Sequence, residues 1–311
     1  MSWKLTISNY RCLREFTIAM GGLTVLVGPN STGKSSILRA LDPTVTIEGK
    51  DAWQHDTSAT IYMVTQGEFG YSRQYTLKDE SWEVQETGEP YTFQQFHLDL
   101  AAARTANMVK QEHQLADDGY NLTNLIGSLS RRQMDELATK FCSLIPAFSD
   151  VDVRADQSVR AGSHRLLFQD RWHERIWYTA DEVSDGTIAV LALLAFSHQK
   201  NPADVFVYEE PERMLHPFLL GQVVQMLRQI SEGKVGEVGK GPRVVIATHS
   251  PTLLEHCQAD EVRFLGRNRI GEVEVREAPS SAKEWKGVLE EYDGSIGTLW
   301  LSGALGGVPG Q

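Results

Sequence analysis

Residues 28–35 read Gly-Pro-Asn-Ser-Thr-Gly-Lys-Ser and match every fixed position of the phosphate-binding pattern G-x-x-x-x-G-K-S/T. The apolar run Leu23–Val27 precedes this loop and a predicted helix, Ser36–Leu41, follows it. That strand, loop and helix order is the context the pattern requires. Glycines let the backbone close around an anion so that successive N–H groups point at its oxygens. The sequence therefore predicts a nucleoside triphosphate site rather than a chance glycine-rich turn.

The loop assigns roles to individual side chains. Lys34 is predicted to reach the β- and γ-phosphates, and the Ser35 hydroxyl to coordinate Mg²⁺. The cofactors predicted for the site are ATP and Mg²⁺. The residues predicted to contact the nucleotide from this segment are Gly28, Pro29, Asn30, Ser31, Thr32, Gly33, Lys34, Ser35 and Ser36.

Length and composition set limits on the remaining classes. The chain has 311 residues, of which 41% are hydrophobic and 23% charged, enough for one large α/β domain or two modest ones. The three cysteines are scattered and lack metal-ligand spacing, which favours a reducing cytoplasm over a disulfide framework. The first residues lack a signal-peptide core. The longest apolar run, Ile188–Phe196, is too short to span a bilayer, so no membrane insertion is expected.

The charge balance bears on nucleic-acid partners. The formal net charge of −11 argues against a uniformly basic binding surface, because tight autonomous DNA binding relies on phosphate neutralisation. A local cluster contains Arg154, Arg160, Arg165, Arg171 and Arg175, with His164 and His173 nearby. Asp and Glu residues are interspersed among these side chains, which favours a solvated surface of mixed charge. Nucleic acid stays a possible partner.

The chain reads as an α/β protein with an added β layer. Strands are predicted at Lys4–Ile7, Glu15–Ala19 and Leu23–Val27. Pro43 is a predicted helix stop. From Thr44 to about Phe96 the sequence is rich in Thr, Tyr, Trp and Val with frequent turn residues, which predicts an antiparallel layer.

The character changes at Leu98. Residues 98–117 and 121–145 are helical in composition, and strands are predicted at Val151–Arg154 and Arg165–Phe168. An alternating α/β pattern then returns. Its predicted elements are the helix Asp185–Gln199, the strand Val205–Tyr208, the helix Pro217–Ile230, the strand Val244–Ala247 and the helix Pro251–Cys257. The tail Gly294–Gln311 is predicted to be either a docked terminal segment or a frayed end.

Two carboxylates end the apolar strand Val205–Tyr208. Such a strand, in a chain with a P-loop, delivers acids beside the phosphates. Glu209 is predicted to hold Mg²⁺, directly or through water, and Glu210 to orient and deprotonate the attacking water. A strand that merely meets solvent is the simpler alternative, and the P-loop argues against it.

A histidine ends the next apolar strand, Val244–Ala247. Parallel strands of one sheet deliver their carboxyl ends to one crevice, so His249 can converge with Glu210 on one γ-phosphate. There it could stabilise the charge that develops during transfer. Isolated histidines are more often structural, but the strand-end position favours a functional role.

A second anion-binding turn is predicted at Val183–Thr187, directly before an apolar helix. The Ser184 hydroxyl and the backbone N–H of Gly186 could bind phosphate at the helix start. Because the P-loop already fills the chain's own phosphate site, this turn would serve the nucleotide of another subunit. Alone, the turn reads as an ordinary helix N-cap.

These residue sets resemble, in chain order, the Walker A, signature, Walker B and switch-histidine motifs of ABC-type ATPase heads. Ser184-Asp185-Gly186-Thr187, the run Glu209–Pro217 and Thr248-His249-Ser250-Pro251 are similar to the RecF-like and OLD-like branch, soluble ATPases of DNA repair and bacterial phage defence. Residues 7–11 also resemble that branch's opening I-x-N-F/Y-K/R, which implies that Arg11 lies near the nucleotide. The likeness extends to the end, at residues 297–303.

The resemblance implies an α/β P-loop NTPase of ABC-ATPase type, with a RecA-like parallel core, an antiparallel β layer and a helical insert lobe. A single domain spans 1–311, with a nucleotide-binding lobe at 1–97 and 181–275, a helical lobe at 98–180 and a tail at 276–311. The Q-loop glutamine, a metal contact, is assigned to Gln95; Gln94 is a near alternative and Gln66 a weaker one.

Some positions depart from the pattern. Glu209 stands where Asp is commoner, and Arg213-Met214 stand where the OLD-like group tends to have Asn-Gly. The D-loop role is therefore not carried over to residues 212–214. OLD proteins proper continue into a Toprim nuclease domain, for which the sequence after His249 is too short.

The leading functional hypothesis is an ATP-sandwiched homodimer that hydrolyses ATP and controls a separate effector, a nuclease, in phage defence or DNA repair. The alternative is a RecF-like DNA clamp that loads partners and cuts nothing. A transporter subunit is disfavoured because such subunits carry Leu-Ser-Gly-Gly-Gln and Asp-Glu-Pro-Thr where this chain has Val183–Thr187 and Glu209–Glu212. An SMC-type structural ATPase would need long coiled-coil arms, for which 311 residues leave no room.

Overall fold

The computed structural model describes residues 3–156, 161–234, 241–278 and 282–304. The chain divides into two compact units. The first unit comprises Met1–Gln94, Ala203–Pro211 and Arg243–Gln311, and the second comprises Gln95–Pro202 and Glu212–Pro242. The lobes proposed from the sequence differ from this division in that they group residues 181–202 and 212–242 with the nucleotide-binding part.

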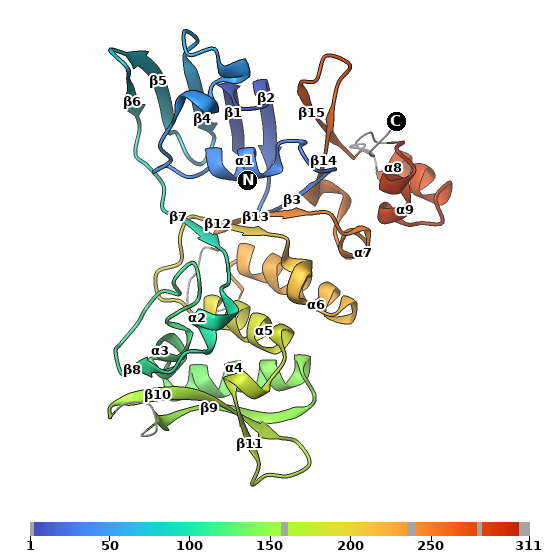
Figure 1. Ribbon diagram of the computed structural model, residues 1–311. Helices are drawn as coiled ribbons and strands as arrows, with labels where there is room; N and C mark the ends of the chain where they lie inside the picture. Colours follow the sequence, from blue (N-terminus) through green and yellow to red (C-terminus); the bar gives the residue numbers. More distant parts are fainter. Residues whose placement is uncertain (1–2, 157–160, 235–240, 279–281, 305–311) are drawn as a thin grey trace. The chain divides into compact units, whose positions relative to one another are not determined.

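A six-stranded sheet forms the centre of the first unit, in the order β15-β14-β3-β13-β12-β7 (Figure 1). Its strands are β3 (Leu23–Val27), β7 (Phe93–Phe96), β12 (Val205–Glu209), β13 (Arg243–Thr248), β14 (Val262–Arg267) and β15 (Val273–Glu277). The inner strands β12, β13, β3 and β14 are parallel, and β15 is antiparallel. Their carboxyl ends therefore meet at one edge, as the sequence predicted.

An antiparallel sheet in the order β2-β1-β4-β5-β6 covers part of this core. Its strands are β1 (Trp3–Tyr10), β2 (Leu13–Met20), β4 (Ile61–Gln66), β5 (Ser72–Lys78) and β6 (Ser81–Thr87). Alternate residues of β1, among them Leu5 and Ile7, join one buried cluster with Val205 and Val245 of the parallel sheet. The predicted antiparallel layer is confirmed.

Short helices complete the first unit: α1 (Lys34–Ala40), α7 (Pro251–Leu254), α8 (Ala282–Glu290) and α9 (Ile296–Leu301). Helix α9 packs on α7 and buries Leu299 and Trp300. The Glu255 carboxylate accepts hydrogen bonds from the Ser295 hydroxyl and from the Gly297 N–H. Of the two readings of the tail, docking is therefore observed over 295–304; residues 305–311 lie outside the described residues.

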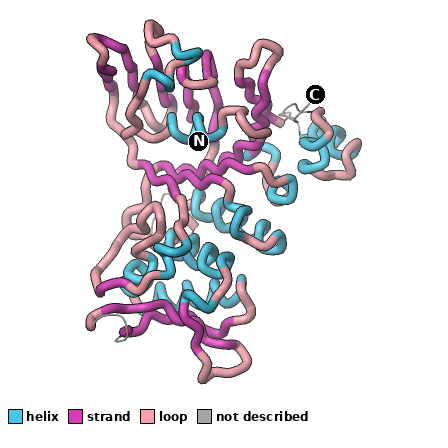
Figure 2. The backbone as a smooth tube through the Cα atoms, in the orientation of Figure 1, coloured by secondary structure: helices cyan, strands magenta, loops and turns pink. Residues whose placement is uncertain are grey.

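The second unit contains helices and a small sheet (Figure 2). Its helices are α2 (Leu100–Arg104), α3 (Leu122–Gly127), α4 (Arg131–Leu144), α5 (Asp185–Phe196) and α6 (Pro217–Ser231), and its strands are β8 (Asn107–Met108), β9 (Phe148–Asp156), β10 (Ser163–Asp170) and β11 (Trp177–Thr179). Strand β10 pairs with all three others. Residues 187–196 of α5 are all buried, because a helix apolar on every side lies inside a core.

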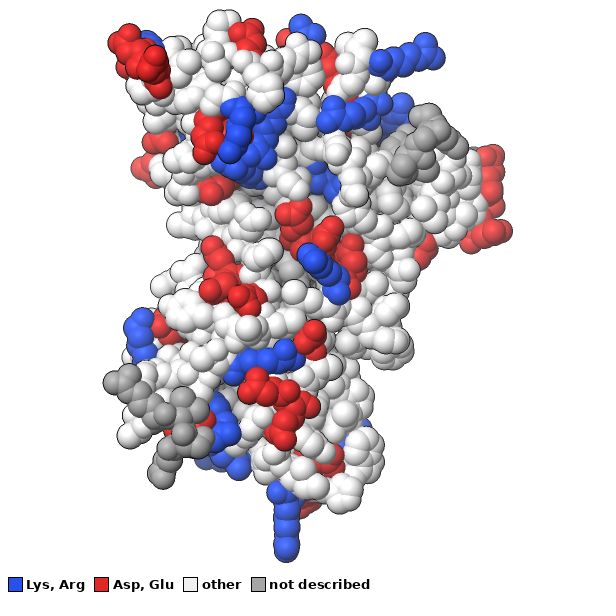
Figure 3. All heavy atoms as spheres, viewed as in Figure 1, with Lys and Arg blue, Asp and Glu red and all other residues white. Residues whose placement is uncertain are grey.

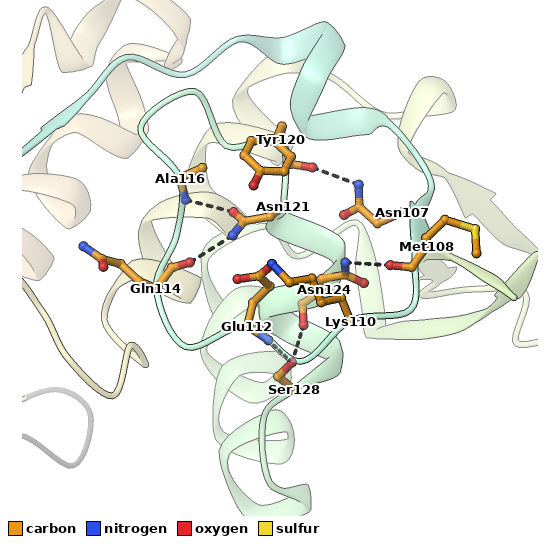
Figure 4. Close-up of polar contacts among 10 residues, drawn as sticks. All are labelled: Asn107, Met108, Lys110, Glu112, Gln114, Ala116, Tyr120, Asn121, Asn124 and Ser128. Atoms are coloured by element: carbon orange, nitrogen blue, oxygen red, sulfur yellow. Dashed lines mark hydrogen bonds and ion pairs between the residues drawn. The ribbon is translucent and has the colours of Figure 1, made fainter.

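The helix predicted over 98–117 is wrong. Only α2 forms, and the chain then turns at Thr105 into β8 and a loop. Side chains around α3 hold this loop (Figure 4): Asn121 accepts from the N–H of Ala116 and donates to the carbonyl of Gln114, at 2.8 and 3.0 Å. Asn124 donates to the carbonyl of Met108 at 2.8 Å. These bonds satisfy backbone groups that a helix would have satisfied internally.

The region predicted as helical over 121–145 is interrupted. Helix α3 ends at Gly127 and α4 begins at Arg131. Ser130 caps α4 and forms a reciprocal capping box with Gln133, which fixes a helix start inside the predicted segment.

Candidate nucleotide-binding site

A cavity of about 410 Å³ lies at the carboxyl ends of β3, β12, β13 and β14 in the first unit. This volume is within the range of small-molecule sites. The lining residues are Arg11, Cys12, Asn30, Ser31, Gly33, Lys34, Ser35, Ser36, Glu209, Glu210, His249 and Arg267. The structure thus brings the P-loop side chains together with both predicted carboxylates and the predicted histidine.

The P-loop is held by its own side chains. The Lys34 ammonium donates to the carbonyl oxygens of Gly28 and Pro29 at 2.7 and 2.8 Å. The Thr32 hydroxyl donates to the same Pro29 oxygen at 2.8 Å. These bonds tie the end of the loop to its beginning, and Lys34 still lines the cavity.

Two glycines of the loop cannot carry a side chain without rearrangement. A Cβ at Gly28 would lie 2.6 Å from the Leu265 carbonyl oxygen. Gly33 has a φ of +89°, and a Cβ there would lie 3.0 Å from the Cys12 sulfur. The loop therefore needs glycine at both ends, because of close packing at Gly28 and of a left-handed backbone at Gly33.

The predicted magnesium ligands lie together. The Ser35 hydroxyl donates to Oε1 of Glu209 at 2.5 Å. A hydroxyl and a carboxylate at one point match the hard oxygen ligands that Mg²⁺ takes beside nucleotide phosphates. The donor set therefore fits the predicted ion, and the lysine and glycine-lined loop beside it fit the phosphates.

The predicted general base lies beside the predicted switch histidine. Nε2 of His249 is 3.5 Å from Oε1 of Glu210. Both side chains keep about a third of their surface exposed, 32% and 39%, so water reaches them. Glu210 has a φ of +50°, and its N–H donates to the Ala247 carbonyl at 2.8 Å. This bond to β13 fixes the direction in which the carboxylate leaves the strand.

Arg11 lines the cavity from the turn between β1 and β2. Its Nε donates to Oδ1 of Asp51 at 2.7 Å, and the Asp51 side chain is 1% exposed. Burial lowers the pKa of the Arg11 guanidinium, but the hydrogen bond to Asp51 and the negative charge of that carboxylate raise it more, so that the net shift is upward. The arginine is thus a fixed cation at the cavity, and its contact with the nucleotide stays a prediction.

Sequence reasoning missed Arg267 and Cys12 as lining residues. Arg267 is the last residue of β14 and donates from Nε and Nη2 to the Ser31 carbonyl, at 2.9 and 2.7 Å. The rule that found His249 would have found Arg267, because β14 also runs parallel to β3. Cys12 could have been found from its position next to Arg11.

The predicted signature residues belong to the second unit. Ser184 is the N-cap of α5: its Oγ accepts from the Thr187 N–H at 3.2 Å. The ordinary capping role is therefore real; Ser184 is an exposed residue, and its Oγ also lies 2.8 Å from Oγ1 of Thr187. A Cβ at Gly186 would lie 3.0 Å from the Met214 carbonyl oxygen. Their role toward another subunit's nucleotide stays a prediction.

The glutamine assignment also stays a prediction. Gln94 is a buried residue of the first unit, whereas Gln95 is half-buried and begins the second. Both lie on β7. Gln66 ends β4 and is exposed.

Two arginines of the cluster in the second unit are paired with acids. Arg154 bonds Asp152 at 2.8 Å and lies over the Trp177 ring, and Arg165 bonds the buried Asp156 at 2.6 Å. Arg160 lies outside the described residues. In the face drawn in Figure 3, basic and acidic side chains are interspersed. The arrangement agrees with a surface of mixed charge.

Two further features are absent from the described part of the chain. It holds no cluster of three or more His, Cys, Asp or Glu side chains placed to bind a metal ion. Nor does it hold a helix with the length and apolar character needed to cross a membrane. All three cysteines carry free thiols.

Comparisons with known proteins agree with an ATPase of AAA or ABC type. Residues 69–255 match the family described as "AAA domain, putative AbiEii toxin, Type IV TA system", and residues 4–46 match a second family described as "AAA domain". The OLD nuclease of Thermus scotoductus is 49% identical over 39 residues, a stretch that covers 12% of this chain and 7% of that protein.

Solved structures establish the fold. The SMC head domain from Thermotoga maritima is similar with a TM-score of 0.54 and 15% identity, covering 89% of this chain and 98% of that one. An Smc head bound to the C-winged helix domain of ScpA gives 0.62 and 13%, covering 91% and 98%. The Smc head with an extended coiled coil, bound to a ScpA domain derived from Pyrococcus furiosus, gives 0.60 and 12%, covering 94% and 99%. The predicted P-loop fold of ABC type is confirmed.

Proposed function

This chain belongs to the family of AAA domains whose model matches residues 69–255, and we propose that it binds Mg²⁺-ATP in the cavity above β3, β12 and β13 and hydrolyses it. The observation that carries the proposal is the pairing of Ser35 with Glu209 at 2.5 Å, one residue before the pair formed by Glu210 and His249. Glu209, the proposed metal ligand, and Glu210, the proposed proton acceptor, are thus adjacent at the end of β12.

The proposed roles follow from these positions. Lys34 binds the β- and γ-phosphates, and Arg11 and Arg267 add cations at the cavity wall. Ser35 and Glu209 hold Mg²⁺, which when bound neutralises charge on the phosphate oxygens. Glu210 accepts the proton of the attacking water. His249 donates a hydrogen bond that stabilises the charge developing on the transferred phosphoryl group.

The proposed active assembly is a head-to-tail homodimer with two nucleotides at its interface. Each nucleotide contacts one subunit's P-loop and the Ser184–Gly186 turn of the other. Support comes from the second, exposed turn at the start of α5, for which the chain's own P-loop leaves no use. A Ser184→Arg substitution should block closure by its bulk while the single subunit still binds ATP.

Mixing variants tests this assembly. Lys34→Ala and Ser184→Arg are each expected to be inactive alone. A mixed dimer of the two has one site with both substitutions and one site with neither, so turnover should return. Light scattering with a stable ATP analogue checks that dimers form. Mixed dimers without any recovered turnover would contradict the shared site.

We further propose that the ATPase controls a separate effector, a nuclease, in bacterial phage defence or DNA repair. Support comes from the 39-residue similarity to the OLD nuclease and from the matched family's description, "putative AbiEii toxin, Type IV TA system". Within the described residues no metal-binding cluster of the kind used for phosphodiester cleavage exists. The protein alone should therefore leave plasmid DNA and RNA intact with ATP and Mg²⁺ or Mn²⁺. If the Lys34→Ala variant cleaves plasmid DNA or RNA, the proposal that a separate effector carries the nuclease activity is wrong.

A further inference from the structure

Arg104 joins the end of α2 to the turn that precedes α5, entirely within the second unit. Its Nε donates to the Ala180 carbonyl and its Nη2 to the Val183 carbonyl, both at 2.9 Å. Nη2 also lies 2.9 Å from Oδ1 of Asp185. One guanidinium therefore contacts three residues of a six-residue segment, 180–185.

The segment held by Arg104 joins a short turn to the start of α5. Residues 180–182 form a single 3-10 turn, which Thr179 and Glu182 close by a capping box. Val183 is extended, and its carbonyl oxygen receives the Nη2 bond. The next residue, Ser184, begins α5. The direction in which the chain enters α5 is therefore set at the Val183 carbonyl.

The chemistry of the contact suits a rigid clamp. A guanidinium is planar and offers donors in a fixed fork, so that bonds to two carbonyls fix their relative position. The Arg104 side chain is only 17% exposed, whereas Asp185 is 61% exposed. The guanidinium is thus mostly buried beside the two carbonyls, whereas the Asp185 carboxylate is largely solvated.

We propose that Arg104 is a positioning residue that holds the 180–185 segment so that Ser184 and Gly186 meet the nucleotide of the partner subunit. The inference rests on the proposed shared site and adds the residue that shapes its second half. Arg104 touches no nucleotide in this scheme. It acts through Val183 and the start of α5, so its effect belongs to the partner's site.

Two substitutions of Arg104 test its contacts with the 180–185 segment. Arg104→Ala removes all three contacts and should lower turnover at saturating ATP by about 10- to 100-fold, the size expected for a misplaced contact group. ATP affinity of the single chain should stay within about twofold of wild type. Arg104→Lys keeps the charge and can bond one carbonyl, so it should recover part of the rate.

Arg132→Ala is the matched control. Arg132 lies on α4, is 88% exposed and pairs across one helical turn with Glu136. It should leave turnover and thermal unfolding unchanged. A fall in rate for Arg104→Ala that is matched by Arg132→Ala would overturn the inference.

Mixing with Lys34→Ala decides the mode of action. A dimer of Arg104→Ala and Lys34→Ala has one site with both substitutions and one intact site, so recovery should equal that of the Ser184→Arg and Lys34→Ala pair. This recovery requires a folded Arg104→Ala subunit, because its P-loop supplies the intact site. Recovery with Ser184→Arg but not with Arg104→Ala overturns the positioning role and leaves the shared site standing. If neither mixture recovers turnover, both the positioning role and the shared site are overturned.

Discussion

The hydroxyl of Ser35 and the carboxylate of Glu209 are joined by a hydrogen bond of 2.5 Å although the residues are 174 positions apart in the chain. The bond links the end of the P-loop to the end of β12. The two residues proposed as metal ligands therefore come together only in the folded parallel sheet. The site is therefore a product of tertiary structure, even though each half has a local sequence pattern.

Lys34→Ala should weaken ATP binding by roughly a hundredfold, since each hydrogen bond to a charged group contributes about 1.5–3 kcal/mol. The substitution also removes the bonds from Nζ to the carbonyls of Gly28 and Pro29. Calorimetric titration with Mg²⁺-ATP measures the effect. Unchanged thermal unfolding would assign the loss to the phosphate contact, and an unchanged affinity would remove Lys34 from the site.

Glu210→Gln should leave ATP binding within about twofold of wild type and lower the hydrolysis rate by about 10²- to 10⁴-fold, the usual contribution of a general base. The amide keeps the shape and the backbone bond to Ala247 but cannot take a proton. Single-turnover hydrolysis and titration with ATP separate the two effects. Near wild-type turnover in this variant would show that another group accepts the proton.

Asp51→Asn should loosen Arg11. The buried carboxylate bonds Nε of Arg11 and also accepts from the Glu48 N–H at 3.0 Å. Because Arg11 is partly exposed, the expected cost in unfolding free energy is about 1–2 kcal/mol. ATP affinity should fall as well, because the cation loses its fixed position.

The control for Asp51 is Arg14→Ala, which removes an exposed ion pair with Glu272 and should change neither quantity. Denaturant unfolding and ATP titration compare the variants. If Asp51→Asn lowers stability but leaves ATP affinity at the wild-type value, then Arg11 does not contact the nucleotide.

Mg²⁺-ATP should protect Cys12 from alkylation. Cys12 lines the cavity and is half-buried. Burial raises the pKa of the Cys142 thiol to about 11, so that at pH 8 only about 0.1% of it is the reactive thiolate. Cys257 is buried. N-ethylmaleimide at pH 8 should therefore modify Cys12 first.

Peptide mass spectrometry measures the rate at each cysteine with and without nucleotide. Lys34→Ala should abolish the protection while leaving the unprotected rate unchanged. Equal alkylation of Cys12 in the presence and absence of ATP would mean that the nucleotide does not cover that wall of the cavity.

Strand-end reasoning predicted most of the cavity. Each of the strands before Gly28, Glu209 and His249 is a short apolar run with a polar end, and the parallel sheet makes those ends converge. Arg267 escaped notice because the run Val262–Leu265 was not assigned as a strand of the sheet. The rule that parallel strands end at one edge of the sheet applies to this strand as well, so Arg267 was predictable from the sequence.

The helical insert was less predictable. Residues 98–117 have a helical composition, but three of their backbone groups bond to the side chains of Asn121 and Asn124. Composition and periodicity describe the local preference for helix or strand. They do not reveal that a side chain from another segment forms hydrogen bonds to a loop. Arg104 is a similar case, since its partners lie 76 and 79 residues away.

The positive φ of Glu210 restricts what that position can become. At +50° a β-branched side chain clashes with its own backbone, whereas Asn, Asp and Gly tolerate the conformation. A replacement at position 210 must therefore meet two separate requirements. It must accept the backbone conformation, and it must carry out the proposed proton transfer. A Val or Ile at this position would destabilise the fold, so its activity would not report on proton transfer. Only residues that accept the backbone conformation, such as Gln, Asn or Gly, can report on it.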